Sequence, residues 1–108
     1  EEMGDKGVLG NTITYCAAIS ACEKGGQWQR ALQLMEHMHE KGVPANTITY
    51  SAAISACEKG RKWQKALQLM EEMRETGVPA NTITYNAAIS ACEKGRQWQR
   101  ALQLMEEM

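Results

Sequence analysis

Apolar residues recur along the chain at intervals of three and four, the spacing that places side chains on one side of an α-helix. After residue 47 a first apolar stripe is formed by Tyr50, Ala53, Ile54 and Cys57. A second stripe with the same spacing is formed by Trp63, Ala66, Leu67, Met70 and Met73. The sequence shows no sustained period-two alternation and no Asn-Gly or Asp-Gly hairpin turn, so strands are not expected. The pattern predicts two successive helices and an all-α chain.

Residues that favour helix ends stand at the ends of both stripes. Asn46, two places after Pro44, is a predicted N-cap for the first helix. Gly60 is placed to end that helix, and Gly77, with Pro79 two residues on, is placed to end the second.

This pair of helices occurs three times in the sequence. Asn11, Asn46 and Asn81 lie 35 residues apart, and Thr-Ile-Thr-Tyr follows each of them. We therefore expect repeats at 12–46 and 47–81 and a truncated third repeat at 82–108. A unit of this size cannot bury a core alone, so the copies must stack. The predicted fold is an α-solenoid of stacked helix-turn-helix hairpins with a 35-residue repeat.

Residues 1–11 align with the end of the second repeat, where EEMGDKGVLG matches EEMRETGVPA. We expect 1–11 to be the tail of a preceding repeat and the chain to be part of a longer array.

Tryptophan and cysteine also recur with the repeat. The tryptophans, Trp28, Trp63 and Trp98, are expected to pack between helices rather than to form a cofactor site. The repeated cysteines are Cys22, Cys57 and Cys92. Because copies of one position face equivalent neighbours rather than each other, we expect buried thiols in a reducing compartment and no bridges among them.

Composition argues against several classes of function. The formal net charge is −1, so no strong basic field indicates a nucleic-acid partner. No apolar run approaches the roughly 18 residues of a membrane span, and no signal or transit peptide is visible. His37 and His39 are the only histidines, and the second repeat has Glu72 and Arg74 in their places. We therefore expect no catalytic site, no metal site and no cofactor.

One position in an otherwise constant fourteen-residue segment varies: it is Cys16, then Ser51, then Asn86. Since repeat interfaces must match one another, we expect this variable side chain not to pack between repeats and to project into a shared groove. One changeable hydrogen-bonding residue per repeat suits a polymer that is recognised one unit at a time, as in repeats that bind one RNA base each. The alternative is neutral variation at a solvent-facing position.

The unit resembles a pentatricopeptide repeat. The matching motifs are Thr49-Tyr50 near the start, Ala66-Leu67-Gln68-Leu69 in the second helix, Glu71-Glu72-Met73, and the turn Gly77-Val78. The resemblance covers essentially the whole chain. Tetratricopeptide repeats have a 34-residue period and a different first-helix motif, and this chain has neither.

The resemblance implies roles for particular residues. The fifth and last residues of each repeat would contact the base edge, which gives the pairs Cys16 with Asn46 and Ser51 with Asn81, and Asn86 without its partner. The second residue would pack against the flat face of the base, which gives Ile13, Ile48 and Ile83. In this family Ser with Asn implies adenine and an Asn fifth residue implies a pyrimidine, whereas the base for Cys with Asn stays open. The Asn at each repeat end would also act as an N-cap.

A lysine stands at the end of each first helix, at Lys24, Lys59 and Lys94. The resemblance gives it a contact with the RNA backbone. A base at a helix C-terminus also favours the helix macrodipole, and the sequence leaves both roles open.

Two functions follow as expectations. The first is sequence-biased binding of single-stranded RNA, one base per repeat, in RNA processing in mitochondria or chloroplasts, as the family resemblance implies. The second is a protein-interaction scaffold whose groove takes a peptide or helix, as in other α-solenoids. The variable residue and the recurring lysine favour RNA, whereas the near-neutral charge favours a protein partner.

Overall fold

The computed structural model describes residues 8–107, and within them α-helices joined by short turns and loops are the only regular secondary structure. Consecutive helices pair into three hairpins, and the first helix of each hairpin carries the repeated Thr-Ile-Thr-Tyr segment. The helices are α2 (Val8–Lys24), α3 (Trp28–Glu40), α4 (Thr47–Lys59), α5 (Trp63–Glu75), α6 (Thr82–Lys94) and α7 (Trp98–Glu107). Helix α2 begins at Val8, inside the segment 1–11 expected to be a repeat tail, and the first seven residues of that segment lie outside the described part.

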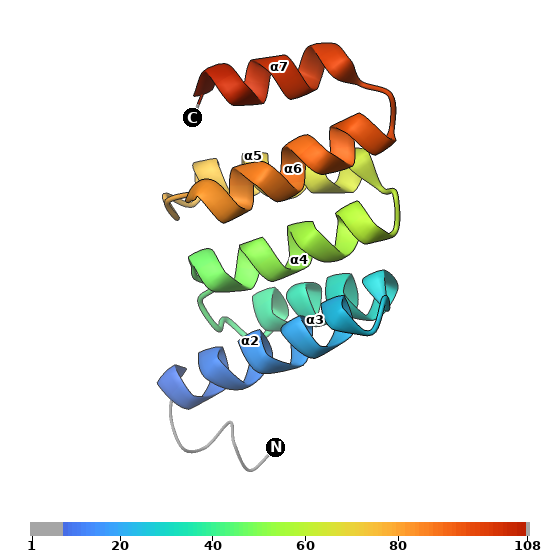
Figure 1. The fold of residues 1–108 in the computed structure, drawn as a ribbon. Coiled ribbons are helices and arrows are strands. Elements are labelled where there is room, and N and C mark those ends of the chain that lie inside the picture. The colour runs from blue at the N-terminus through green and yellow to red at the C-terminus, as the bar shows by residue number, and fades with distance from the viewer. Residues whose placement is uncertain (1–7, 108) are drawn as a thin grey trace.

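The hairpins stack into an elongated body measuring 45 × 27 × 19 Å (Figure 1). The first helices α2, α4 and α6 pack directly against one another, while α3 and α5 each pack between the first helix of their own hairpin and that of the next. Within the described residues, the second helices α3, α5 and α7 make no close backbone contact with one another. The solenoid predicted from the 35-residue period is therefore confirmed, and its tightest layer is the layer of first helices.

Burial in α4 differs from the single stripe predicted for it. The predicted residues are buried, but so are Thr49, Ala52 and Ala56 on other sides of the helix. The reason is position, because α4 has α2 on one side, α6 on the other and second helices behind it. In α5 the prediction holds for Ala66, Met70 and Met73, whereas Leu69 is buried and Leu67 only partly so.

The starts of α4 and α6 carry the predicted asparagine caps. The Asn46 side-chain oxygen accepts a hydrogen bond from the Thr49 backbone N–H at 2.9 Å, and the Thr49 hydroxyl accepts one from the Asn46 N–H at 3.2 Å. Asn81 and Thr84 form the same reciprocal capping box. A cap of this kind stabilises a helix by about 1 kcal/mol.

Gly60 ends α4 as predicted, but its backbone φ of −87° is open to any residue. The left-handed conformation falls on the next residue, Arg61, with φ 59°. In the first hairpin the residue in that conformation is Gly26, with φ 73°. Backbone conformation therefore does not explain why glycine stands at position 60. The explanation is its contact with the preceding hairpin.

That contact is made by tryptophan. A Cβ atom added at Gly60 would lie 2.6 Å from Cγ and 2.9 Å from Nε1 of Trp28, and closest of all to Cδ1. Gly95 receives Trp63 in the same way, with Cγ at 2.7 Å. The expectation that these tryptophans pack between helices is confirmed for Trp28 and Trp63, which lie partly buried against the core.

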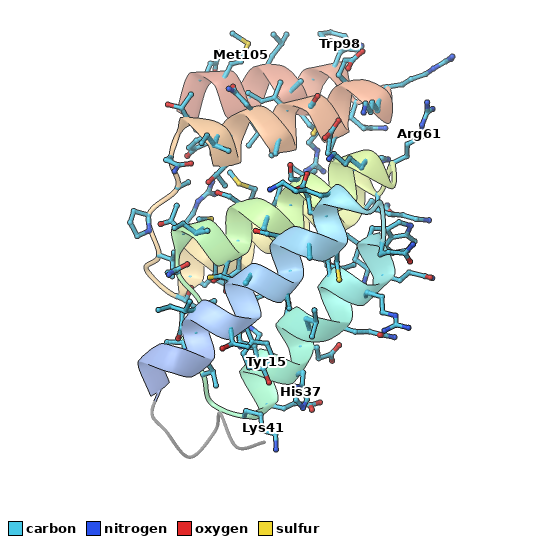
Figure 2. All side chains as sticks on the ribbon, turned by 60° about the horizontal axis from the view of Figure 1, so that its bottom comes forward. Tyr15, His37, Lys41, Arg61, Trp98 and Met105 are labelled. Atoms are coloured by element: carbon cyan, nitrogen blue, oxygen red, sulfur yellow. The ribbon has the colours of Figure 1, made fainter. Side chains whose placement is uncertain are left out.

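Trp98, the third tryptophan, is 65% exposed. Figure 2 shows it with Met105 at the α7 end of the stack.

Candidate nucleic-acid interface

Three isoleucines on the first helices are unusually exposed. Ile13, Ile48 and Ile83 are 67%, 62% and 65% accessible, although Ile19 and Ile54 on the same helices are fully buried. Each exposed isoleucine lies in the segment Thr-Ile-Thr-Tyr, and Ile48 and Ile83 lie in the first turn of α4 and α6. Burying an isoleucine side chain stabilises a contact by about 1.5–3 kcal/mol, so these three residues offer apolar surface at repeat spacing.

Cys16 lies beside its predicted partner. Its Sγ is 3.5 Å from Oδ1 of Asn46 and 2.8 Å from Oγ1 of Thr49. Asn46 and Thr49 both belong to the start of the next hairpin, and Asn46 is also the N-cap of α4.

Ser51 and Asn81 are connected indirectly, through hydrogen bonds that each makes with Thr84. The Ser51 hydroxyl lies 2.6 Å from Oγ1 of Thr84, and the Thr84 hydroxyl donates to Oδ1 of Asn81 at 2.9 Å. Thr84 is completely buried, whereas Asn81 is exposed. The threonine therefore connects the two residues from below the surface.

These contacts correct one expectation from the sequence. The variable position was expected not to pack between repeats, yet Cys16 and Ser51 are half-buried and each bonds to the following hairpin. The physical reason is the close packing of the first helices, which brings the variable residue of one helix against the N-terminus of the next. Asn86 is exposed, and the position equivalent to Asn46 and Asn81 lies past residue 108.

Two of the three lysines at the helix ends, Lys59 and Lys94, have acidic partners that the sequence reasoning missed. Lys59 Nζ lies 2.6 Å from a carboxylate oxygen of Glu23, and Lys94 pairs in the same way with Glu58. Each pair joins a lysine to the glutamate of the preceding first helix. The signal in the sequence was the constant Glu-Lys-Gly triplet, since adjacent first helices in register bring the glutamate of one beside the lysine of the next.

Side-chain contacts also join neighbouring second helices. His39 contacts Glu72, and Arg74 donates to Glu107 at 2.6 Å. These side chains bridge adjacent second helices, whose backbones stay apart.

A hollow of about 340 Å³ opens between α3 and α5. Leu32, Met35 and Leu69 line it, and charged residues including Glu36 and Glu72 surround it. An equivalent but smaller hollow of about 110 Å³ lies between α5 and α7. Both lie in the layer of second helices, and neither is lined by any of the predicted base-contacting residues.

The histidines make structural contacts. His37 Nδ1 lies 2.6 Å from the Tyr15 hydroxyl. Figure 2 shows these two labelled residues near each other. Within residues 8–107 no cluster of three or more His, Cys, Asp or Glu side chains could hold a metal ion. None of the helices in this part of the chain has the length and apolar character needed to cross a bilayer.

Burial sets the chemistry of the repeated cysteines. All four cysteines of the chain are free thiols, and Cys57 and Cys92 are fully buried as expected, whereas Cys22 is partly exposed. Loss of solvent raises the pKa of the Cys57 thiol to about 11, and it also raises the pKa of Cys92. These thiols are therefore inert core groups rather than nucleophiles.

Comparison with known families gives matches along nearly the whole chain. Residues 10–59 and 52–94 match the model of the PPR repeat family, and residues 83–108 match the model of the PPR repeat. No curated protein matches the chain significantly.

Proposed function

Because the chain belongs to the PPR (pentatricopeptide) repeat family, whose members generally bind RNA, we propose that it binds single-stranded RNA with one base per repeat. In this proposal the repeats are 12–46, 47–81 and 82–108, preceded by a repeat tail at 1–11. The binding face is the layer of first helices.

The observation that carries the proposal is the row of exposed isoleucines Ile13, Ile48 and Ile83. Packed helices lie about 8–10 Å apart, whereas stacked bases along one strand lie about 3.4 Å apart. An RNA that meets one hairpin per nucleotide must therefore unstack. An isoleucine under each base would replace the lost stacking surface, in keeping with the way proteins bind unstacked single-stranded RNA.

Base choice would rest on the polar residues beside each isoleucine. We propose Cys16 with Asn46 and Ser51 with Asn81 as the pairs that contact base edges, and Asn86 for the third base. Following the family pattern, Ser51 with Asn81 would favour adenine and Asn86 a pyrimidine. Cysteine is a weak hydrogen-bonding group, so discrimination at the first base would be poor.

Backbone contacts would come from Lys24, Lys59 and Lys94. Three such phosphate contacts would give a slope of about −2 in a plot of log affinity against log salt. The ion pairs of Lys59 with Glu23 and Lys94 with Glu58 compete with phosphate and should reduce this slope. Binding by this chain should therefore be weak and only moderately sensitive to salt.

Nuclear magnetic resonance of the isoleucine methyl groups tests the proposal on the chain itself. On titration with oligoadenylate, the methyl signals of Ile13, Ile48 and Ile83 should shift. The buried Ile19 and Ile54 supply matched controls on the same helices and should stay unchanged. If the exposed and buried isoleucines respond alike, or none responds at any RNA concentration, the proposal is refuted.

A second candidate function is a protein-interaction scaffold, which the hollow of about 340 Å³ between α3 and α5 favours. Its apolar floor would take a hydrophobic side chain of a partner peptide. Methyl signals from Met35 and Leu69 would then respond to the partner, while the three exposed isoleucines would not respond to RNA.

PPR proteins typically work in mitochondria or chloroplasts, so we assign the proposed binding to organellar RNA processing. Microscopy of the full reading frame fused to a fluorescent protein tests this assignment, which a cytosolic signal would contradict.

A further inference from the structure

We propose that two buried threonines, Thr49 and Thr84, are positioning residues that determine which atoms each base-contacting pair presents to RNA. This inference rests on the proposed function and adds a third residue to each pair. The third residue comes from the following hairpin.

Thr84 is the centre of a small hydrogen-bond network. Its Oγ1 lies 2.6 Å from Ser51 Oγ, 2.9 Å from Asn81 Oδ1 and 3.4 Å from the Asn81 backbone nitrogen. Its own N–H also donates to Asn81 Oδ1 at 2.9 Å. With no exposed surface, Thr84 does not reach a ligand itself and acts through Ser51 and Asn81.

The number of hydroxyl protons determines which group donates in each hydrogen bond of this network. The amide oxygen Oδ1 of Asn81 only accepts, so the single hydroxyl proton of Thr84 is donated to it. In the contact between the two hydroxyls, Ser51 must then be the donor. The Ser51 oxygen is left with lone pairs for a ligand, and Asn81 is left with its amide N–H groups. The pair therefore presents one acceptor and one donor in a fixed arrangement.

A related arrangement occurs one hairpin earlier, with sulfur in place of oxygen and with a direct contact of 3.5 Å from Cys16 Sγ to Asn46 Oδ1. Thr49 donates its hydroxyl proton to Asn46 Oδ1 at 2.9 Å, and Cys16 Sγ lies 2.8 Å from Thr49 Oγ1. Thr49 is also fully buried. The thiol that faces RNA here is only a weak acceptor, so the same network should give a weaker base preference at this site.

The test measures base discrimination rather than affinity alone. Oligonucleotides that differ only at the nucleotide facing Ser51 would be titrated against the chain and against Thr84→Val, which keeps the shape and removes the hydroxyl. Without its acceptor, the Ser51 proton is free to turn toward the ligand and Asn81 loses one of its two anchoring bonds. Since a neutral hydrogen bond contributes about 0.5–1.5 kcal/mol, the preference for adenine should fall by about 2- to 10-fold.

Two further variants separate positioning from a merely structural role. Thr84→Ser restores the hydroxyl and should restore the preference. Thr76→Val makes the same chemical change at a threonine whose hydroxyl donates to backbone carbonyls at the end of α5, and it should leave the preference opposite Ser51 unchanged. If Thr84→Val does not fold, Thr84→Cys, which keeps a weak donor in place, should fold and show a reduced preference.

The outcomes distinguish this inference from the function on which it rests. If the unaltered chain neither binds RNA nor prefers a base, the proposed function fails, and the inference fails with it. If the unaltered chain prefers adenine and Thr84→Val, or Thr84→Cys in its place, prefers it equally, the inference alone is overturned. Loss of affinity for all bases alike would also overturn it.

Discussion

Replacing Gly60 by alanine should destabilise the stack because Trp28 occupies the space that a Cβ would need. The added carbon would lie 2.6 Å from Trp28 Cγ, about 0.9 Å inside an ordinary carbon–carbon contact of about 3.5 Å. Overpacking of this kind costs about 1–3 kcal/mol. Backbone strain adds nothing, since the φ of −87° suits alanine.

The chain supplies its own control at Gly25, which holds the same place in the first hairpin. There a Cβ would come no nearer than 3.4 Å to any neighbour, so Gly25→Ala should be neutral or stabilise by about 0.4–1 kcal/mol through the unfolded state. Urea unfolding of the two variants would measure the difference.

A double-mutant cycle identifies the cause. In a Trp28→Ala background the clash is gone, so Gly60→Ala should no longer destabilise. If Gly60→Ala costs the same with and without Trp28, or if Gly25→Ala is as harmful, the packing argument is wrong.

Three other predictions follow from the geometry. Arg61→Gly should raise the unfolding free energy by about 0.5–1 kcal/mol in urea titrations, because Arg61 holds a φ of 59° that glycine adopts without strain; a loss of stability would contradict this. Cys57 should react with iodoacetamide far more slowly than the partly exposed cysteines until the protein unfolds, and its raised pKa gives a stabilising contribution that is complete below pH 9.0 and lost as the pH rises toward about 11; equal labelling rates, followed by mass spectrometry, would refute the assignment. Glu58→Gln should release Lys94 and increase both RNA affinity and its salt slope, by up to about 0.7 in the slope, and an unchanged slope would show that Lys94 does not meet phosphate.

The sequence predicted the architecture well because the 35-residue period and the helical stripes depend on local spacing alone. Asn46 as a cap followed from its residue type and its place before the first stripe, and the structure adds its reciprocal bond with Thr49. The exposure of Ile48 leaves its side chain accessible to a ligand, and its role beside a base stays a prediction.

Contacts between hairpins could not be predicted from the sequence, because they depend on how one hairpin is rotated against the next. Gly60 illustrates this, since its sequence position indicated a helix end and its actual constraint is Trp28 of the preceding hairpin. The pairing of Lys59 with Glu23 and the bond from Ser51 to Thr84 have the same origin. The residues that make these contacts recur in every repeat. Comparing each repeat with the next could therefore indicate which residues face each other across a hairpin interface.

The central claim, that each hairpin selects one base, is tested most directly by changing Ser51 to asparagine and measuring preference at every nucleotide of a bound RNA. The account predicts that preference moves from adenine toward a pyrimidine at a single nucleotide and stays the same at its neighbours. A variant that binds all RNA sequences equally better or equally worse, with no change confined to one nucleotide, would contradict it.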